Sequence, residues 1–366
     1  MEFSIHVQVL SIALATGLVL GAVTSKTNFC TLGAVSDWVN MGDSARMRSW
    51  FLAIGVAILG ATTLDTTGVA VIGVNTFPPY QTPSFAWLRY LLGGAMFGVG
   101  MTLASGCGSK TLVRIGNGNL KSLLVLLVAS LCAYAMLWTD LYGTAFNPWI
   151  VATSLDLTKY GFHSQSLSDL LGQSRAVVGG LIGAALVLAV FTGKDFRQNR
   201  DAILGGLVMG GAVVVGWYVT GGPMGKQWKE FADFADIRPL RVDTQSLTFV
   251  SPMGDLLHYL SSPRDFSLLN FGIMAMLGVV LGSFCYTCWN RQFRVERFAN
   301  GKDFFSHMLG AVLMGIGGVL AMGCTIGQGV TGVSTLSLGS ILALFAMIAG
   351  AAGTMKYLYW QILREG

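Results

Sequence analysis

The sequence has few charged residues for its length. Aspartate, glutamate, lysine and arginine make up 11% of the 366 residues, against roughly 25% in an ordinary soluble domain. Hydrophobic residues make up 53%, and 48 residues are glycine, which is nearly twice the average usage. So few charges cannot cover so much apolar surface in water. The composition therefore excludes a soluble protein and predicts an all-α membrane protein that crosses the lipid bilayer several times.

Two chemical signatures are also missing. The sequence has no Gly-x-x-x-x-Gly-Lys-Ser/Thr motif, the phosphate-binding loop of many ATP-driven proteins. The Cys285-Tyr-Thr-Cys288 pair has neither a second such pair nor a nearby histidine to complete a zinc site. We therefore predict no metal site and no cofactor. The net charge of +5 does not require a nucleic-acid partner, because the inner loops of membrane proteins collect lysine and arginine.

Apolar runs long enough to cross a bilayer, about twenty residues each, occur nine times. The first is too long for a cleaved signal peptide. The short loops with positive clusters fall on one side if the N-terminus is periplasmic and the C-terminus cytoplasmic, which is the orientation that we favour. The predicted spans cover roughly residues 5–24, 49–73, 85–105, 120–138, 174–193, 201–219, 268–289, 303–322 and 337–361.

One stretch occurs twice. Gly310–Cys324 matches Gly93–Cys107 at a constant offset of 217, with seven identities in fifteen positions and a shared Leu-Ala-x-Gly-Cys ending. The glycines alone would fit two ordinary packing helices, but the matching cysteines favour a paired site. Because the copies lie on the third and eighth spans, they cross in opposite directions and predict an inverted repeat.

The repeat suggests how the chain is organised. We expect a single membrane domain over residues 1–366, with repeat halves at about 5–138 and 201–361 linked by about 139–200. A weaker echo, Asn28-Phe29-Cys30 and Ser283-Phe284-Cys285, does not obey this symmetry, because the first and seventh spans run the same way. Either the span count is off by one or the echo is chance.

After each Gly-Cys the chain is punctuated by glycine and unsuited to a continuous helix. Non-helical backbone at membrane depth persists only where protein or water satisfies its polar groups. Such breaks expose helix N-termini, which bind anions; the alternative is ordinary interfacial turns. The candidate pathway-lining residues around the breaks are Gly106, Gly108, Lys110, Gly323, Thr325, Gly327 and Gln328.

Three cysteines share this setting of a broken apolar segment. A thiol is a weak hydrogen-bond donor and a soft, polarizable group, so it can face a soft sulfur atom without a large dehydration cost. Cys30, Cys107 and Cys324 are therefore candidates for a ligand pathway. We interpret Cys132, in the middle of a span, as a small buried hydrophobe.

Other polar residues leave alternatives open. Cys285 and Cys288 would share one helical face and could form a redox pair, although Arg291 is the only basic residue close in sequence that could lower a thiol pKa. Asp65 is either a functional or paired carboxylate inside the membrane or the polar outer end of a shorter span. His307 could shuttle protons or simply lie at the interface.

Three motifs together resemble the YeeE/YedE sulfur-transport family over about residues 10–355. The resemblance implies a bacterial inner-membrane permease that takes up thiosulfate and is not an enzyme, with a duplicated, hourglass-shaped fold and short inserted helices. The motifs are Asn28-Phe-Cys30-Thr-Leu-Gly33, then Ala104-Ser-Gly-Cys107-Gly with Arg114-Ile-Gly-Asn-Gly118, and Met322-Gly-Cys324-Thr-Ile-Gly-Gln-Gly329.

The resemblance also implies roles for individual residues. Cys30, Cys107 and Cys324 would line the pathway and pass thiosulfate along through S–H···S hydrogen bonds. A small TusA-like sulfurtransferase would be the cytoplasmic partner. Gly-Cys-Gly-Ser-Lys110 replaces the family's more usual Gly-Cys-Thr-x-Gly, which places a positive charge near the pathway. A related sulfur anion, a selenium compound, or a membrane thiol oxidoreductase using Cys285 and Cys288 stay as alternatives.

Overall fold

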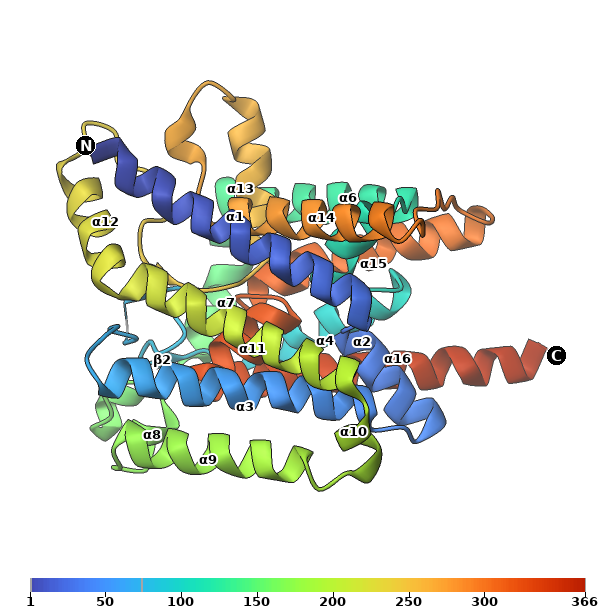
Figure 1. The fold of residues 1–366 in the computed structure, drawn as a ribbon, viewed down its shortest axis with the longest axis horizontal. Coiled ribbons are helices and arrows are strands. Elements are labelled where there is room, and N and C mark those ends of the chain that lie inside the picture. The colour runs from blue at the N-terminus through green and yellow to red at the C-terminus, as the bar shows by residue number, and fades with distance from the viewer. Residues whose placement is uncertain (1, 74, 366) are drawn as a thin grey trace.

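The computed structural model describes residues 2–73 and 75–365, and its long helices lie along one axis of the molecule (Figure 1). Eight segments in this described part are long and apolar enough to cross a membrane, which confirms a polytopic all-α membrane protein. The long helices of these segments are α1 (Glu2–Thr27), α3 (Ala45–Thr66), α4 (Trp87–Leu103), α6 (Leu120–Trp138), α11 (Arg200–Gly221), α14 (Phe271–Trp289), α15 (Gly301–Leu320) and α16 (Leu338–Glu365).

The ninth predicted span, 174–193, corresponds to a shorter helix, α9 (Arg175–Val190). Its 16 residues extend about 24 Å, less than the roughly 30 Å of a bilayer core. It packs antiparallel on α3, since Gly179 lies against Thr62 and Gly183 against Leu59. The two chain ends lie at opposite ends of the long axis (Figure 1), which fits an odd number of traverses only if the shorter α9 is counted with the eight long segments.

Shorter elements connect the long helices and fill the space between them. The described residues include two pairs of very short strands, β1 with β4 in parallel and β2 with β3 antiparallel. These elements are α2 (Thr31–Ser36), η1 (Asp37–Met41), β1 (Thr76–Phe77), β2 (Ser84–Phe85), α5 (Gly108–Gly116), η2 (Tyr142–Phe146), α7 (Asn147–Thr153), β3 (Leu155–Asp156), η3 (Leu157–Tyr160), α8 (Leu167–Leu170), α10 (Lys194–Gln198), α12 (Pro223–Phe234), β4 (Thr244–Gln245), α13 (Val250–Ser261), η4 (Phe266–Leu268) and η5 (Gly327–Gly332).

The two repeated helices, α4 and α15, pack directly on each other and run in opposite directions, as predicted. A Cβ atom built on Gly100 would lie 2.7 Å from the Gly310 carbonyl oxygen, and one built on Gly317 would lie 2.9 Å from the Gly93 carbonyl oxygen. Equivalent glycines of the two copies therefore meet crosswise. Only glycine allows two helix backbones to approach so closely.

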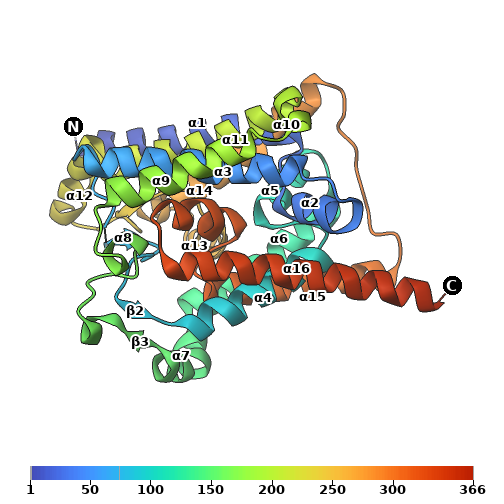
Figure 2. The same ribbon diagram turned by 90° about the horizontal axis from the view of Figure 1, so that it is seen from below.

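The neighbours of this central pair repeat the same relation. Gly98 of α4 packs against Met347 and Ala351 of α16, and the equivalent Gly315 of α15 packs against Ala129 and Cys132 of α6. Around them, α1 pairs with α14 and α3 pairs with α11. Seen from below, α4, α15 and α16 form one side of the molecule, and α1, α3, α9 and α11 form the other (Figure 2).

The echo between Cys30 and Cys285 has no counterpart in this arrangement. Helices α1 and α14 do run in parallel, because Gly17 lies against Ala275 and Gly21 against Val279. Cys30, however, follows the end of α1, whereas Cys285 lies within α14. The two cysteines therefore have different structural positions.

Asp65 lies in the last turn of α3, at the polar end of a span that stops at Thr66. Its carboxylate is 3.0 Å from Nη1 of Arg175 and accepts a 2.9 Å hydrogen bond from the backbone N–H of Ile72. The side chain thus joins α3 to the start of α9 and to the following loop. This is a structural ion pair at the shorter span end that the sequence allowed.

Candidate functional site

Each of the three candidate cysteines stands at the start of a short helical segment. Cys30 is the N-cap of α2, and its sulfur accepts a 3.5 Å hydrogen bond from the Gly33 backbone N–H. Cys107 is the N-cap of α5. Cys324 precedes the turn that leads into η5, and its sulfur accepts a 3.4 Å hydrogen bond from the Gly327 backbone N–H. Helix breaks are therefore present, but they lie at and just before Cys107 and Cys324, and a helical segment follows each cysteine where an irregular chain was expected.

The break before Cys107 and the break before Cys324 have the same backbone conformation. Ser105 and Met322, equivalent positions of the repeat, both have left-handed backbones, with φ values of 57° and 62°. A non-glycine residue seldom adopts this region, and holding one there costs about 1–3 kcal/mol. The surrounding packing compensates for this strain in both copies. In each copy the left-handed residue turns the chain, and the following Gly-Cys begins a new helical segment.

The thiols come together at the centre of the molecule. The Cys107 thiol lies close to the Cys30 thiol and 3.3 Å from the Ser109 hydroxyl. The Thr325 hydroxyl also lies close to the Cys107 thiol. A Cβ atom built on Gly108 would lie 4.0 Å from the Cβ of Cys324. Cys107 and Cys324 have no exposed surface, whereas Cys30 is half-buried.

Most of the other predicted lining residues lie in this central region. Gly106 and Gly323 immediately precede the two cysteines. Gly327 donates its N–H to Cys324. Gln328 is fully buried and donates from Nε2 to the Ala321 carbonyl, while its Oε1 has no hydrogen-bond partner among the described residues. This free acceptor lies one turn beyond Cys324.

Lys110 lies on one side of the thiols, in an open cleft of about 420 Å³ that also contains Cys30 and Gly33. The side chains of Arg46 and Arg114 line the same cleft. The sequence indicated Lys110 because it follows Gly-Cys, but it did not mark the two arginines as site residues. Arg114 lies one helical turn after Lys110 on α5, whereas Arg46 comes from α3 and only the fold brings it to the cleft.

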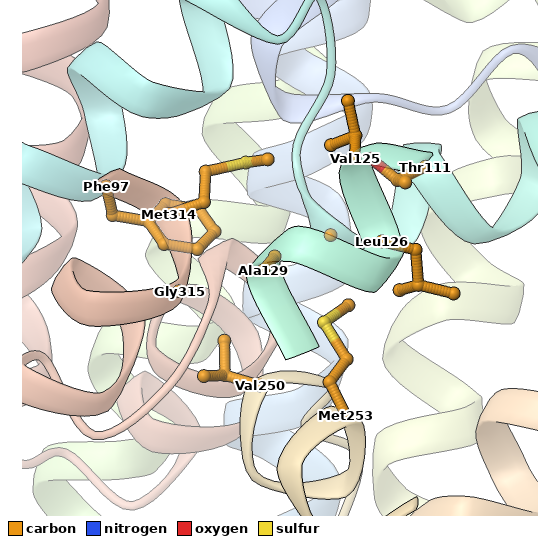
Figure 3. A pocket seen from close by; sticks show the side chains of 10 residues that line it. Phe97, Thr111, Val125, Leu126, Ala129, Val250, Met253, Met314 and Gly315 are labelled. Carbon is orange, nitrogen blue, oxygen red and sulfur yellow. The ribbon is translucent and has the colours of Figure 1, made fainter. Parts of the chain in front are cut away.

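On another side of Cys107, apolar side chains fill the space between α4, α6, α13 and α15. A cavity of about 10 Å³ is left there, which is room for about one water molecule. Val250 and Met253 reach it from α13, opposite Leu126 and Ala129 of α6 (Figure 3). The Met253 methyl would be 3.2 Å from a Cβ atom on Gly108, so Met253 packs against the residue that follows Cys107.

Helices α2 and α13 occupy corresponding places in the fold. Helix α2 contacts α3 and α16, and α13 makes the equivalent contacts with α14 and α6. Cys30 is the N-cap of α2, whereas Phe249 is the N-cap of α13 and Val250 is its first residue. The start of α13 therefore has no cysteine in the place of Cys30.

Cys285 and Cys288 lie apart from this cluster. Both are exposed on α14 as free thiols, and Cys285 lines a surface groove between α1 and α14 with Lys26. Within residues 2–73 and 75–365, no group of three His, Cys, Asp or Glu side chains could hold a metal ion. His307 is mostly buried near the start of α15, where Nδ1 is 3.0 Å from the Asp303 carboxylate.

Comparison with known proteins agrees with this geometry. A family model described as Sulphur transport matches residues 26–353. The chain is 26% identical over 350 residues to Thiosulfate transporter TsuA of Escherichia coli (strain K12), covering 92% of this chain and 91% of that protein. It is 24% identical over 349 residues to Thiosulfate transporter TsuA of Spirochaeta thermophila, covering 92% and 95%. The matched span contains both copies of the repeat and all three cysteines.

Proposed function

The chain belongs to the Sulphur transport family, as its motifs predicted, and from this membership we propose that it is a permease that imports thiosulfate or a closely related sulfur anion. The observation that carries the proposal is the cluster of Cys30, Cys107 and Cys324 at three helix starts in the middle of the bundle. Both relatives are named for thiosulfate transport. No bond of the substrate is broken in this scheme.

The chemistry of the cluster suits a small anion with a soft sulfur end. The thiols offer weak S–H donors and polarizable sulfur, and the helix starts beside them offer partial positive charge. Three such weak sites in succession let an ion move on without being trapped. The anion would pass from Cys324 to Cys107 and then to Cys30, since Cys107 lies between the other two.

We also propose that the chain works as two inverted halves, about 5–138 and 201–361, joined by about 139–200. The reciprocal contacts of α4 with α15, and of their neighbours α16 and α6, support this division. The N-terminus would be periplasmic and the C-terminus cytoplasmic in the bacterial inner membrane, because the short loops at the end of the molecule where α16 terminates are rich in lysine and arginine. A TusA-like sulfurtransferase would then take the product on that side.

In this orientation the cleft at Cys30 would open toward the cytoplasm. Val250 and Met253, which line the small cavity beside Gly108, would close the periplasmic side. Entry of an anion from outside then requires α13 to move relative to α6 and α15.

A growth assay tests the proposal. A bacterium unable to take up sulfate is supplied with thiosulfate as its sole sulfur source, together with this chain or with a Cys107→Ala, Cys324→Ala or Cys285→Ala variant. We expect growth with the original chain and with Cys285→Ala, and loss of growth at Cys107 and Cys324, at equal protein levels in the membrane. Loss of growth at Cys285 alone would favour the thiol oxidoreductase.

A further inference from the structure

The cleft beside Cys30 is lined by three basic side chains. Arg46 lies against the start of α2, because a Cβ atom built on Gly33 would be 2.9 Å from its Nη1 atom. Lys110 and Arg114 flank the break before Cys107, since a Cβ atom on Gly106 would be 3.4 Å from Cγ of Lys110 and 3.9 Å from Nη1 of Arg114. Positive charge therefore borders the glycines next to both thiols.

Little negative charge balances this group. Arg46 pairs with Asp37 at 3.3 Å. Lys110 donates to the Asn28 side-chain oxygen at 3.4 Å, and Arg114 donates to the Ser105 carbonyl at 2.7 Å. Both of these acceptors are neutral, and among the described residues no carboxylate forms an ion pair with Lys110 or Arg114. The cleft thus carries about two uncompensated positive charges.

The corresponding side of the fold has no such chemistry. Val250 and Met253, at the start of α13, line a small cavity whose other side chains are apolar apart from Thr111. None of the described residues that line this cavity is charged. The unpaired cations therefore belong to the cleft and not to both halves of the repeat.

We propose that the cleft is a binding site for a divalent sulfur oxyanion. Lys110, Arg114 and Arg46 hold the SO₃ end of the anion, and its soft sulfur end faces the Cys30 thiol. This inference rests on the proposed transport function and names the substrate class of its cytoplasmic end. A two-ended ligand such as thiosulfate satisfies the cations and the thiol together. Sulfate satisfies only the cations, and sulfide satisfies only the thiol.

The test uses the rate at which Cys30 reacts with charged reagents and needs no transport. The full chain, with Cys132, Cys285 and Cys288 changed to alanine, is purified in detergent and labelled with an anionic or a cationic maleimide. Cys107 and Cys324 have no exposed surface, so labelling should report Cys30 and should disappear in Cys30→Ala. The variants are Lys110→Met, Lys110→Arg and, as a control for an exposed cation outside the cleft, Lys302→Met.

A unit charge about 4 Å away in water changes the local energy of a charged reagent by about 1 kcal/mol, or about fivefold in rate. Lys110→Met should therefore slow the anionic maleimide about fivefold and speed the cationic one about fivefold. Lys110→Arg and Lys302→Met should leave the ratio of the two rates unchanged. Sulfate, compared with chloride at equal ionic strength, should protect Cys30 in the original chain and not in Lys110→Met.

Two outcomes would overturn the proposed oxyanion site. One is a ratio of anionic to cationic labelling rates that Lys110→Met changes by less than about twofold. The other is equal protection of Cys30 by sulfate and by chloride. Either result leaves the growth test on thiosulfate untouched. Conversely, if the charge ratio and the protection are as expected but the chain supports no growth on thiosulfate, the anion site stands and the transport proposal fails.

Discussion

The crosswise contact between α4 and α15 predicts a large cost for adding one methyl group. In Gly310→Ala, the new Cβ would lie 2.6 Å from the Ala104 backbone nitrogen and 2.7 Å from the Gly100 carbonyl oxygen. Both neighbours are backbone atoms that cannot rotate away, so the helices must separate by several tenths of an ångström. We expect the free energy of unfolding to fall by about 1–3 kcal/mol, the usual cost of overpacking.

The matched control is Gly353→Ala on α16, where no atom lies within 4 Å of the added Cβ. That change should raise the free energy of unfolding by up to about 0.5–1 kcal/mol, because alanine is the better helix former. Both variants are compared by denaturant unfolding of the purified chain in detergent. Gly100→Ala meets Gly310 at the same contact, so the double variant should cost less than the sum of the two single changes. Equal stabilities of Gly310→Ala and Gly353→Ala would refute the close contact.

Two further predictions concern α13. Asp255 has no exposed surface and receives hydrogen bonds of 2.6 and 2.9 Å from Arg241, so Asp255→Asn should lower the free energy of unfolding by about 3–5 kcal/mol. The exposed Asp233, paired with Arg238, is the control, since Asp233→Asn should cost at most about 1 kcal/mol. Met253→Ala should enlarge the cavity lined by Val250 and Met253. In a variant lacking the other cysteines, it should also speed the labelling of Cys107 by a small neutral maleimide. An unchanged labelling rate would contradict the proposal that Met253 closes access to Cys107.

Much of the architecture follows from local patterns. Apolar runs of sufficient length predicted the eight long membrane helices, because each such run must satisfy its own backbone in lipid. The repeat at an offset of 217 located α4 and α15 and their opposite directions. Family membership followed from the Gly-Cys motifs. The one short span, α9, deviated because its apolar run ends at a turn near residue 191, and periodicity does not reveal how much of a run is helical.

The cleft and the apolar cavity could not be predicted in the same way. Arg46 reaches the cleft from α3, and Val250 and Met253 reach the apolar cavity from α13. Both depend on contacts between segments far apart in the sequence. The left-handed backbone of Met322 was also hidden, because methionine gives no local signal for that conformation.

The difference between the charged cleft beside α2 and the apolar packing at the start of α13 has a consequence for energetics. In a perfectly symmetric repeat, the state open to one side and the state open to the other would be mirror arrangements of equal free energy. Here the side chains differ, so the two states differ in free energy and one of them is the resting state. Such a bias fixes where the empty protein waits for its ligand, but by detailed balance it cannot drive net flux. Accumulation therefore depends on a gradient or on removal of the anion after release.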